Sequence, residues 1–310
     1  MGRAKAAQPG RFAYYGYRSG YVILNLVPRR VALVVAAALG RVGSRFMPRE
    51  RAVVAGNLRH VLSSREAQFD EATLSKLVSA AFASYGRYWA DVASLSPRSS
   101  RRLDSRFHVT GREYIDDALK KGGIIFALPH VGSWEVGGVW ARREGFPFLT
   151  VAEEAANSRL TDWFISRRER LGMRVLRLAP DTSVKLLAEL RSGGAVALVA
   201  DRDVVGDGIV MPFFGTPTRI PPGPAVLALR TGATIIPCVV YQDGAHYEAH
   251  FGPLIVPERR GTLRADVERL TAELVASFEG SIAEHPEQWH AFQPLWGYTD
   301  QMQGLGEGRP

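Results

Sequence analysis

The chain has 310 residues, of which 46% are hydrophobic and 23% are charged, and its formal net charge at pH 7 is +8. This composition excludes a mainly disordered chain and is sufficient for the hydrophobic core of a large domain. The single cysteine, Cys238, excludes a disulfide framework and a metal site built on cysteines, and its apolar neighbours in "IIPCVV" indicate a buried thiol.

Positive charge is concentrated at the beginning of the chain. Residues 1–60 contain eleven lysines and arginines and one acidic residue, Glu50, whereas the remaining residues sum to about −2. Two apolar runs, 21–27 and 31–40, lie inside this segment and are separated by "PRR". Each run is too short to cross a bilayer, for which about 18 to 20 apolar residues are needed.

Residues 1–50 are therefore predicted to be a helical segment that associates with a membrane. Short apolar runs flanked by arginines and tyrosines suit a segment that lies in the interface of an anionic membrane. A buried helix with solvated arginines is the alternative. Basic segments also bind nucleic acids, but this one lacks the interleaved stacking residues of any known module, so we expect no nucleic-acid partner.

After residue 50, helical and strand patterns alternate. Amphipathic helices are predicted over 49–62 and 70–95, and short apolar strands over 122–130, 195–201 and 234–242. Further helical stretches lie between the strands. This alternation predicts an α/β fold with a central, mixed or mostly parallel sheet flanked by helices. We expect one domain over 51–300, followed by a flexible tail over 301–310.

A histidine and a glutamate follow the first predicted strand. His130 falls at the carboxyl end of this strand, and Glu135 lies in the first turn of the helix that follows. In open α/β sheets, ligands bind in the crevice beyond the carboxyl ends of the strands. A carboxylate bonded to one ring nitrogen lets the other nitrogen accept a proton, so His130 with Glu135 is a candidate general base for a hydroxyl. Packing of His130 in the core is the alternative.

A second polar group follows the strand at 195–201. Asp201, Arg202 and Asp203 are expected to reach the same crevice as His130. One of the two carboxylates can bind a sugar acceptor or assist the imidazole, and the sequence leaves open which. The D-x-D pattern also occurs at metal–diphosphate sites, and a surface turn with an Asp–Arg ion pair is the structural alternative.

Several segments resemble one known family. The motif "LPHVGSWE" (128–135) resembles the H-x(4)-D/E motif of the bacterial lysophospholipid acyltransferase superfamily, in particular its lipid A late-acyltransferase type. Three further stretches are similar to segments of that family: "RAVVAGNLRHVL" (51–62), "NSRLTDWFISRRERLG" (157–172) and the block 200–237. The tail "HPEQWHAFQPLW" (285–296) is similar to actinobacterial phosphatidylinositol mannoside acyltransferases.

The resemblance implies an O-acyltransferase that uses acyl-CoA as donor substrate, with no cofactor and no metal. Its acceptor would be a mannose hydroxyl of a phosphatidylinositol mannoside, and its place the cytoplasmic side of the inner (plasma) membrane, bound peripherally. Direct attack by the acceptor is expected, because no serine stands in a G-x-S-x-G elbow. Another glycolipid acceptor, such as a lipid A precursor, and a non-catalytic membrane-binding scaffold are the alternatives.

The expected site residues fall into two groups. The catalytic residues would be His130, Glu135 and Asp203. The substrate-binding residues would be Arg168, Asp201, Arg202 and Arg219, of which Arg168 and Arg219 are suited to phosphate groups.

Overall fold

The computed structural model describes residues 11–64, 69–101, 103–153, 158–203 and 206–296. The first ten residues of the predicted membrane-associating segment and the predicted tail at 301–310 lie outside the described residues.

A mixed sheet of seven strands forms the centre of the described chain, in the order β1-β9-β8-β2-β5-β3-β4. Only β9 and β1 run against the direction of the other strands. The α/β fold with a mostly parallel sheet is thereby confirmed. The strands are β1 (Phe107–Thr110), β2 (Ile124–Leu128), β3 (Phe148–Ala152), β4 (Arg174–Arg177), β5 (Ala195–Val199), β8 (Thr234–Asp243) and β9 (His246–Phe251).

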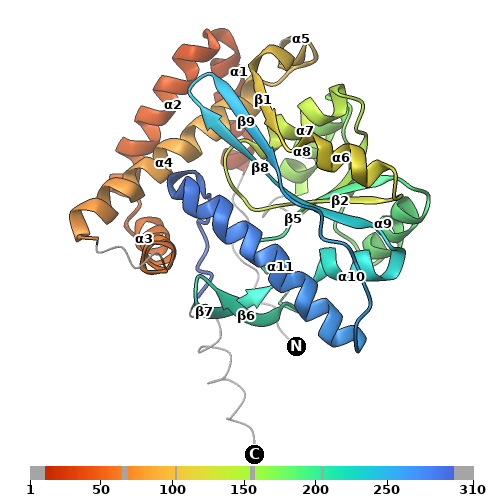
Figure 1. The fold of residues 1–310 in the computed structure, drawn as a ribbon. Coiled ribbons are helices and arrows are strands. Elements are labelled where there is room, and N and C mark those ends of the chain that lie inside the picture. Colours follow the sequence, from red (N-terminus) through yellow and green to blue (C-terminus); the bar gives the residue numbers. More distant parts are fainter. Residues whose placement is uncertain (1–10, 65–68, 102, 154–157, 204–205, 297–310) are drawn as a thin grey trace, which may run out of the picture.

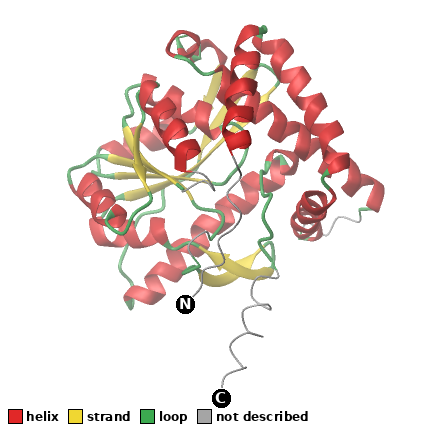
Figure 2. Cartoon of the chain, turned by 180° about the vertical axis from the view of Figure 1, so that it is seen from behind, coloured by secondary structure: helices red, strands yellow, loops and turns green. Residues whose placement is uncertain are grey.

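Helices cover both faces of this sheet (Figures 1 and 2). Side chains alternate along each strand, so Ile125 packs toward one face while Ile124 and Phe126 pack toward the other. The first face is covered by α9 (Thr182–Arg191), α10 (Gly223–Thr231) and α11 (Leu263–Glu284). The second is covered by α6 (Arg112–Leu119) and α7 (Trp134–Arg143). The three strands predicted from apolar runs, β2, β5 and β8, are neighbours in the middle of the sheet. β2 and β8 are buried along almost their whole length, whereas β5 is half-buried except at Val196.

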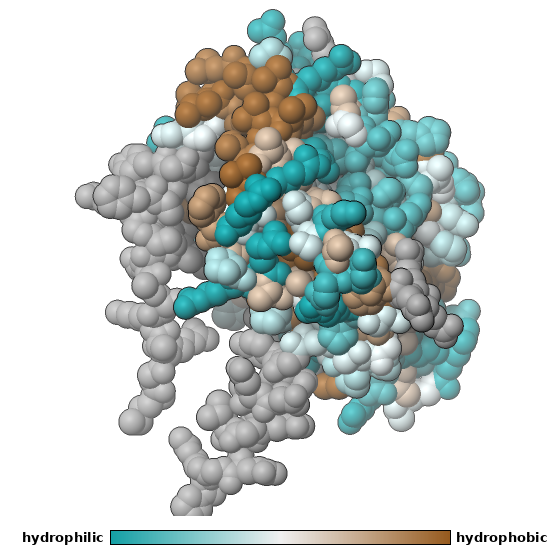
Figure 3. All heavy atoms as spheres, turned by 90° about the vertical axis from the view of Figure 1, so that its left-hand side faces the viewer, coloured by the Kyte–Doolittle hydropathy of each residue, from teal (hydrophilic) through white to brown (hydrophobic). Residues whose placement is uncertain are grey.

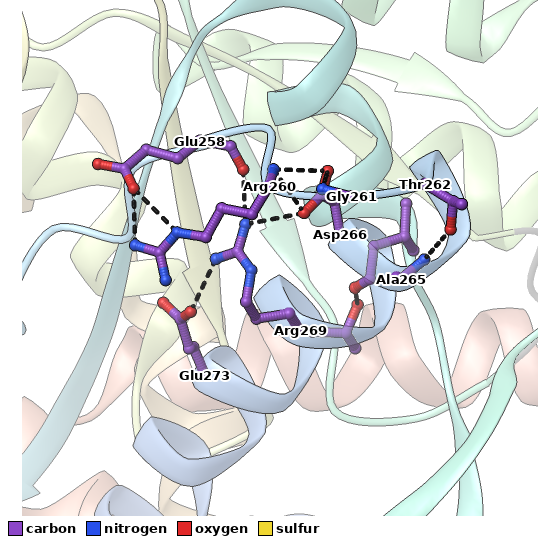
Figure 4. Close-up of polar contacts among 10 residues, drawn as sticks. Glu258, Arg260, Gly261, Thr262, Ala265, Asp266, Arg269 and Glu273 are labelled. Atoms are coloured by element: carbon purple, nitrogen blue, oxygen red, sulfur yellow. Dashed lines mark hydrogen bonds and ion pairs between the residues drawn. The ribbon is translucent and has the colours of Figure 1, made fainter.

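The polar start of α11 fixes this long helix against the chain that precedes it (Figure 4). Thr262 caps the helix by accepting a hydrogen bond from the backbone N–H of Ala265. Asp266 accepts the backbone N–H of Arg260 at 3.1 Å and the guanidinium of Arg269 at 3.3 Å. The Asp266 carboxylate in the first turn of the helix therefore supplies a hydrogen-bond acceptor for the backbone of the turn that precedes the helix.

A helical layer lies at one side of the sheet. It contains α1 (Arg11–Leu26), α2 (Arg29–Gly43), α3 (Pro48–Ser63) and α4 (Glu71–Ser94). Small residues bring α2 and α4 into close contact. A Cβ atom on Gly86 of α4 would lie 2.2 Å from the carbonyl oxygen of Ala36 in α2, so this crossing requires glycine. The remaining elements of the described chain are α5 (Pro97–Ser100), α8 (Ser158–Arg170), the β6–β7 hairpin (Ile209–Phe213 and Thr216–Ile220), and the 3₁₀ turns η1 (Ser44–Phe46), η2 (Asp104–Arg106) and η3 (Pro286–Gln288).

The outer side of α1 and α2 is apolar and exposed. Figure 3 shows hydrophobic side chains gathered on this face of the molecule. The exposed side chains are Val22, Ile23, Leu26, Val27, Val31, Val34, Val35, Leu39, Val42, Phe46 and Met47. Within the described ranges no single helix has the length and hydropathy of a membrane span; residues 29–46 and 48–63 meet that test only as a pair bent by 104°.

Candidate active site

His130 and Asp201 meet because of the register between β2 and β5. Leu128 of β2 pairs with Val199 of β5, and each site residue lies two positions further along its strand. The His130 Nδ1 atom is 2.5 Å from Asp201 Oδ1, and the backbone N–H of His130 donates to Asp201 Oδ2 at 3.0 Å. One carboxylate therefore holds both the ring and the backbone of the histidine.

The Asp201 carboxylate is buried and ionised. Its Oδ2 atom also accepts the indole N–H of Trp289 at 2.8 Å. Burial disfavours the charge, but the attraction of His130 and the hydrogen bonds from His130 and Trp289 outweigh it and lower the pKa of Asp201 to about 2. An ionised carboxylate only accepts hydrogen bonds, so the proton of the neutral imidazole belongs on Nδ1 and Nε2 is left basic.

The turn after His130 is held by its backbone. The N–H of Gly132 donates to the carbonyl of Gln288 at 2.9 Å, and that of Ser133 to the carbonyl of Val240 at 2.8 Å. Gly132 has a φ of +62°, and a Cβ there would lie 2.1 Å from the Val240 oxygen. Glycine is therefore required where this turn meets β8, and the turn holds His130 beyond the carboxyl end of β2.

The predicted hydrogen bond between Glu135 and His130 is wrong. Glu135 pairs with Arg168 of α8, whose Nε donates to Glu135 Oε2 at 3.1 Å and whose Nη2 contacts Oε1. The reason is that α7 begins at Trp134, so the Glu135 side chain leaves the first helical turn toward α8, while Asp201 occupies the ring nitrogen. Burial opposes the Arg168 charge, but Glu135 raises the pKa of Arg168 above its ordinary value.

Three other predicted site residues, Asp203, Arg202 and Arg219, make hydrogen bonds with groups other than His130. Asp203, predicted to be catalytic, accepts the backbone N–H groups of Gly206 at 2.8 Å and Gly208 at 2.9 Å, and no hydrogen bond joins it to His130 among the described residues. Arg202 contacts Glu153 at 3.3 Å. Arg219 is exposed on β7, where it donates to the Gly208 carbonyl, and it is not among the residues that line the groove described next.

A groove of about 840 Å³ runs past His130. Besides His130, its walls include Glu135, Arg168, Arg202 and Asp203, all of them predicted site residues. This volume lies in the range of ligand-binding pockets, which is about 300 to 1,000 Å³. The sheet therefore opens into a ligand-sized cleft at the place where the sequence predicts the site.

A narrower apolar pocket of about 110 Å³ adjoins the groove. It lies between the sheet and helices α6 and α7, and Trp134, Glu135 and Arg168 line both cavities. Its other walls are apolar and include Phe126, Phe148, Trp140, Met173, Cys238 and Phe251. An apolar chain that entered from the groove would pass the Glu135–Arg168 pair.

Comparison with known proteins assigns the chain to an enzyme family. Residues 3–297 match the family described as bacterial lipid A biosynthesis acyltransferase. The chain belongs to this family. The acyltransferase is 33% identical over 291 residues to "Phosphatidylinositol mannoside acyltransferase" of Mycolicibacterium smegmatis, covering 93% of this chain and 92% of the relative. It is 37% identical over 227 residues to the protein of the same name from Mycobacterium tuberculosis H37Rv, covering 71% and 70%.

These matches confirm the resemblance found in the sequence and show that the protein is an acyltransferase of lipid biosynthesis. Among solved structures, the 1-acyl-sn-glycerophosphate acyltransferase PlsC of Thermotoga maritima matches with a TM-score of 0.37 and 13% identity, over 82% of this chain and 98% of that one.

Two residues at the candidate site were not predicted from the sequence. Trp289 bonds Asp201, and His290 donates its backbone N–H to the carbonyl of His130 at 2.8 Å. Both belong to the tail segment 285–296, whose sequence indicated a similarity to the family but no site residue. The available signal was the succession of two polar aromatic residues, Trp289 and His290, within this segment.

His290 is buried in the groove wall with one unsatisfied nitrogen. Its Nε2 atom lies 3.1 Å from Ser84 Oγ, and its Nδ1 atom is buried and has no hydrogen-bond partner within the described part of the chain. Burial lowers the pKa of His290 to about 3, and the charges of His130 and Arg87 act in the same direction. The ring is therefore neutral in the folded acyltransferase near pH 7.

His290 should make stability fall in mild acid. A base whose pKa is lower in the folded state than in the unfolded chain contributes its full stability above about pH 6.5 and loses it as the pH falls toward 3. Between pH 7 and pH 5, the free energy of unfolding should fall by about 2 kcal/mol more in the wild type than in His290→Gln. Urea unfolding of both proteins at the two pH values measures this difference, and equal losses would contradict it.

Proposed function

We propose that the acyltransferase moves a fatty acyl chain from acyl-CoA to a mannose hydroxyl of a phosphatidylinositol mannoside. The observation that carries this proposal is the His130–Asp201 pair, whose histidine lines the open groove. The groove shares Trp134, Glu135 and Arg168 with the apolar pocket. The relatives named phosphatidylinositol mannoside acyltransferase support the choice of acceptor.

The chemistry proposed for His130 is general base catalysis. Nε2 of His130 accepts the proton of the mannose hydroxyl while the hydroxyl oxygen attacks the thioester carbonyl carbon. Asp201 stabilises the imidazolium that forms, because its carboxylate already accepts the Nδ1 proton. The tetrahedral intermediate then expels the CoA thiolate, which takes the proton back from Nε2. The ester bond forms as the thioester bond breaks, and no acyl-enzyme is required.

The two cavities divide the substrates between them in this proposal. The apolar pocket takes the acyl chain, because Phe126, Phe148 and their neighbours offer it no hydrogen bonds. The groove takes the sugar acceptor and the polar part of the donor. Arg202 is proposed to meet a phosphate group there, since its Nε atom is buried without a hydrogen-bond partner among the described residues.

Removal of the base tests the proposal. His130→Ala should lower transfer from labelled acyl-CoA to phosphatidylinositol mannoside by at least about a hundredfold, the usual contribution of general base catalysis, with the thermal unfolding midpoint little changed. The wild type should prefer this acceptor to a lipid A precursor and to lysophosphatidic acid. A folded variant with near-normal turnover would contradict the mechanism, and a preference for another acceptor would contradict the substrate.

We also propose that the outer side of helices α1 and α2, which follow each other over residues 11–43 and are together called the α1–α2 hairpin, rests on the cytoplasmic face of the plasma membrane. The exposed apolar side chains of this hairpin, such as Val34 and Leu39, are 70% and 67% exposed. Exposed arginines stand beside them at Arg41, Arg45 and Arg49. An apolar face with basic neighbours is the arrangement by which helices bind anionic lipid surfaces.

The basic neighbours should determine binding to vesicles. Replacement of Arg41, Arg45 and Arg49 together by Gln should reduce co-sedimentation with anionic vesicles at low salt, because each arginine near the surface adds roughly 1 kcal/mol of attraction. The matched control replaces Arg191, Arg230 and Arg264, which belong to α9, α10 and α11 and are also exposed. If both triple variants sediment like the wild type, or if salt has no effect, the membrane proposal is wrong.

A further inference from the structure

Asp91 is a fully buried carboxylate outside the groove. It lies on α4, is 0% exposed and does not line either cavity. Its Oδ1 atom accepts Nη2 of Arg29 at 2.6 Å and Nε of Arg29 at 3.0 Å, while its Oδ2 atom accepts Ser133 Oγ at 3.2 Å and the side-chain amide of Gln242. Burial of an ion pair such as Arg29–Asp91 costs desolvation free energy, so a contribution to stability alone does not explain its presence.

Arg29 reaches Asp91 from the hairpin that carries the exposed apolar face. It is the first residue of α2, and its guanidinium also donates to the carbonyl of Ala245 at 3.2 Å and contacts the hydroxyl of Tyr247. One side chain thus joins the α1–α2 hairpin, helix α4 and the β8–β9 turn. Arg30, its neighbour in sequence, is exposed. Sequence reasoning placed both arginines at the lipid surface, and the structure turns Arg29 inward.

The other oxygen of Asp91 acts on the turn that carries His130. Ser133 is completely buried, and it stands at the N-cap position of α7. Its backbone N–H is committed to Val240, so its hydroxyl is the group through which α4 reaches the turn. Carboxylates therefore accept hydrogen bonds from both ends of the turn from His130 to Ser133: Asp201 from the first residue and Asp91 from the last.

We propose that Arg29 and Asp91 form a positioning pair, which fixes the turn from His130 to Ser133 and makes acyl transfer depend on a seated α1–α2 hairpin. This inference rests on the proposed role of His130 as the base. Small displacements of a catalytic group are costly, since about 1 Å of misplacement can lower a rate about a hundredfold. A hairpin pulled away from α4 would leave Asp91 without its counter-charge and Ser133 without a fixed acceptor.

The adjacent arginines provide a matched experiment. In detergent-dispersed acceptor, Arg29→Gln should lower kcat at least about tenfold while KM for acyl-CoA changes less than about threefold, because the base is misplaced and the cavities are intact. Arg29→Lys, which keeps the charge, should recover part of kcat. Arg30→Gln should leave kcat unchanged. A folded Arg29→Gln protein with wild-type kcat, or equal effects of Arg29→Gln and Arg30→Gln, would overturn the proposal.

A double-mutant cycle separates positioning from a general loss of stability. Arg29 and Ser133 interact only through Asp91 in the contacts above, so Arg29→Gln should lower kcat much less in a Ser133→Ala background than in the wild type. If Arg29→Gln does not fold, Asp91→Asn replaces it in the same cycle. Additive effects on kcat would overturn the proposal. His130→Ala, measured in parallel, tests the proposed function separately. If this variant retains activity, His130 is not the base and the proposed function is wrong, whatever the result of the cycle.

Discussion

The hydrogen bond between Asp201 and the ring of His130 is the interaction on which the candidate site depends. It exists because β2 and β5 are adjacent parallel strands in register, so that residues two positions past their paired ends stand side by side. Burial makes the carboxylate a costly group, and it is stabilised by the histidine and by the indole of Trp289. The central sheet, the turn after β2 and the C-terminal segment therefore all converge on one pair of side chains.

The same turn shows how the helical layer is tied to the sheet. Gly132 lets the turn approach Val240 closely, and Ser133 extends the contact to Asp91 on α4. Arg29 then brings in the α1–α2 hairpin. A surface proposed to rest on lipid is thus connected to the groove by a chain of buried polar contacts, which suits an acyltransferase whose substrates carry long apolar chains.

Sequence patterns predicted those features that depend on local order. Continuous apolar runs identified β2, β5 and β8, because strands in the middle of a sheet that is covered by helices on both faces carry few polar residues. The position of His130 at a strand end followed from the same pattern. The same pattern did not show which of the two aspartates contacts His130, because this depends on strand register. Asp201 lies opposite His130, while Asp203 accepts hydrogen bonds from the backbone of its own loop.

Contacts between distant segments lay outside what the sequence could indicate. Glu135 is close to His130 in sequence, but its partner is Arg168 on another helix. Trp289 and Asp201 are 88 positions apart, and Arg29 and Asp91 are 62 apart. Only the folded packing of helices on the sheet brings these residues together, and a single sequence contains no record of that packing.

The central claim, that Asp201 is the carboxylate that supports the base, is tested most directly by the rates of two isosteric variants. The transfer rates of Asp201→Asn and Glu135→Gln are measured at saturating acyl-CoA and acceptor. The rate of Asp201→Asn should fall at least about a hundredfold below that of the wild type, because the imidazolium loses its counter-charge. Glu135→Gln should retain kcat within about tenfold of the wild type, since it loses only the charge that pairs with Arg168. The opposite order, with Glu135→Gln inactive and Asp201→Asn nearly normal, would contradict the account.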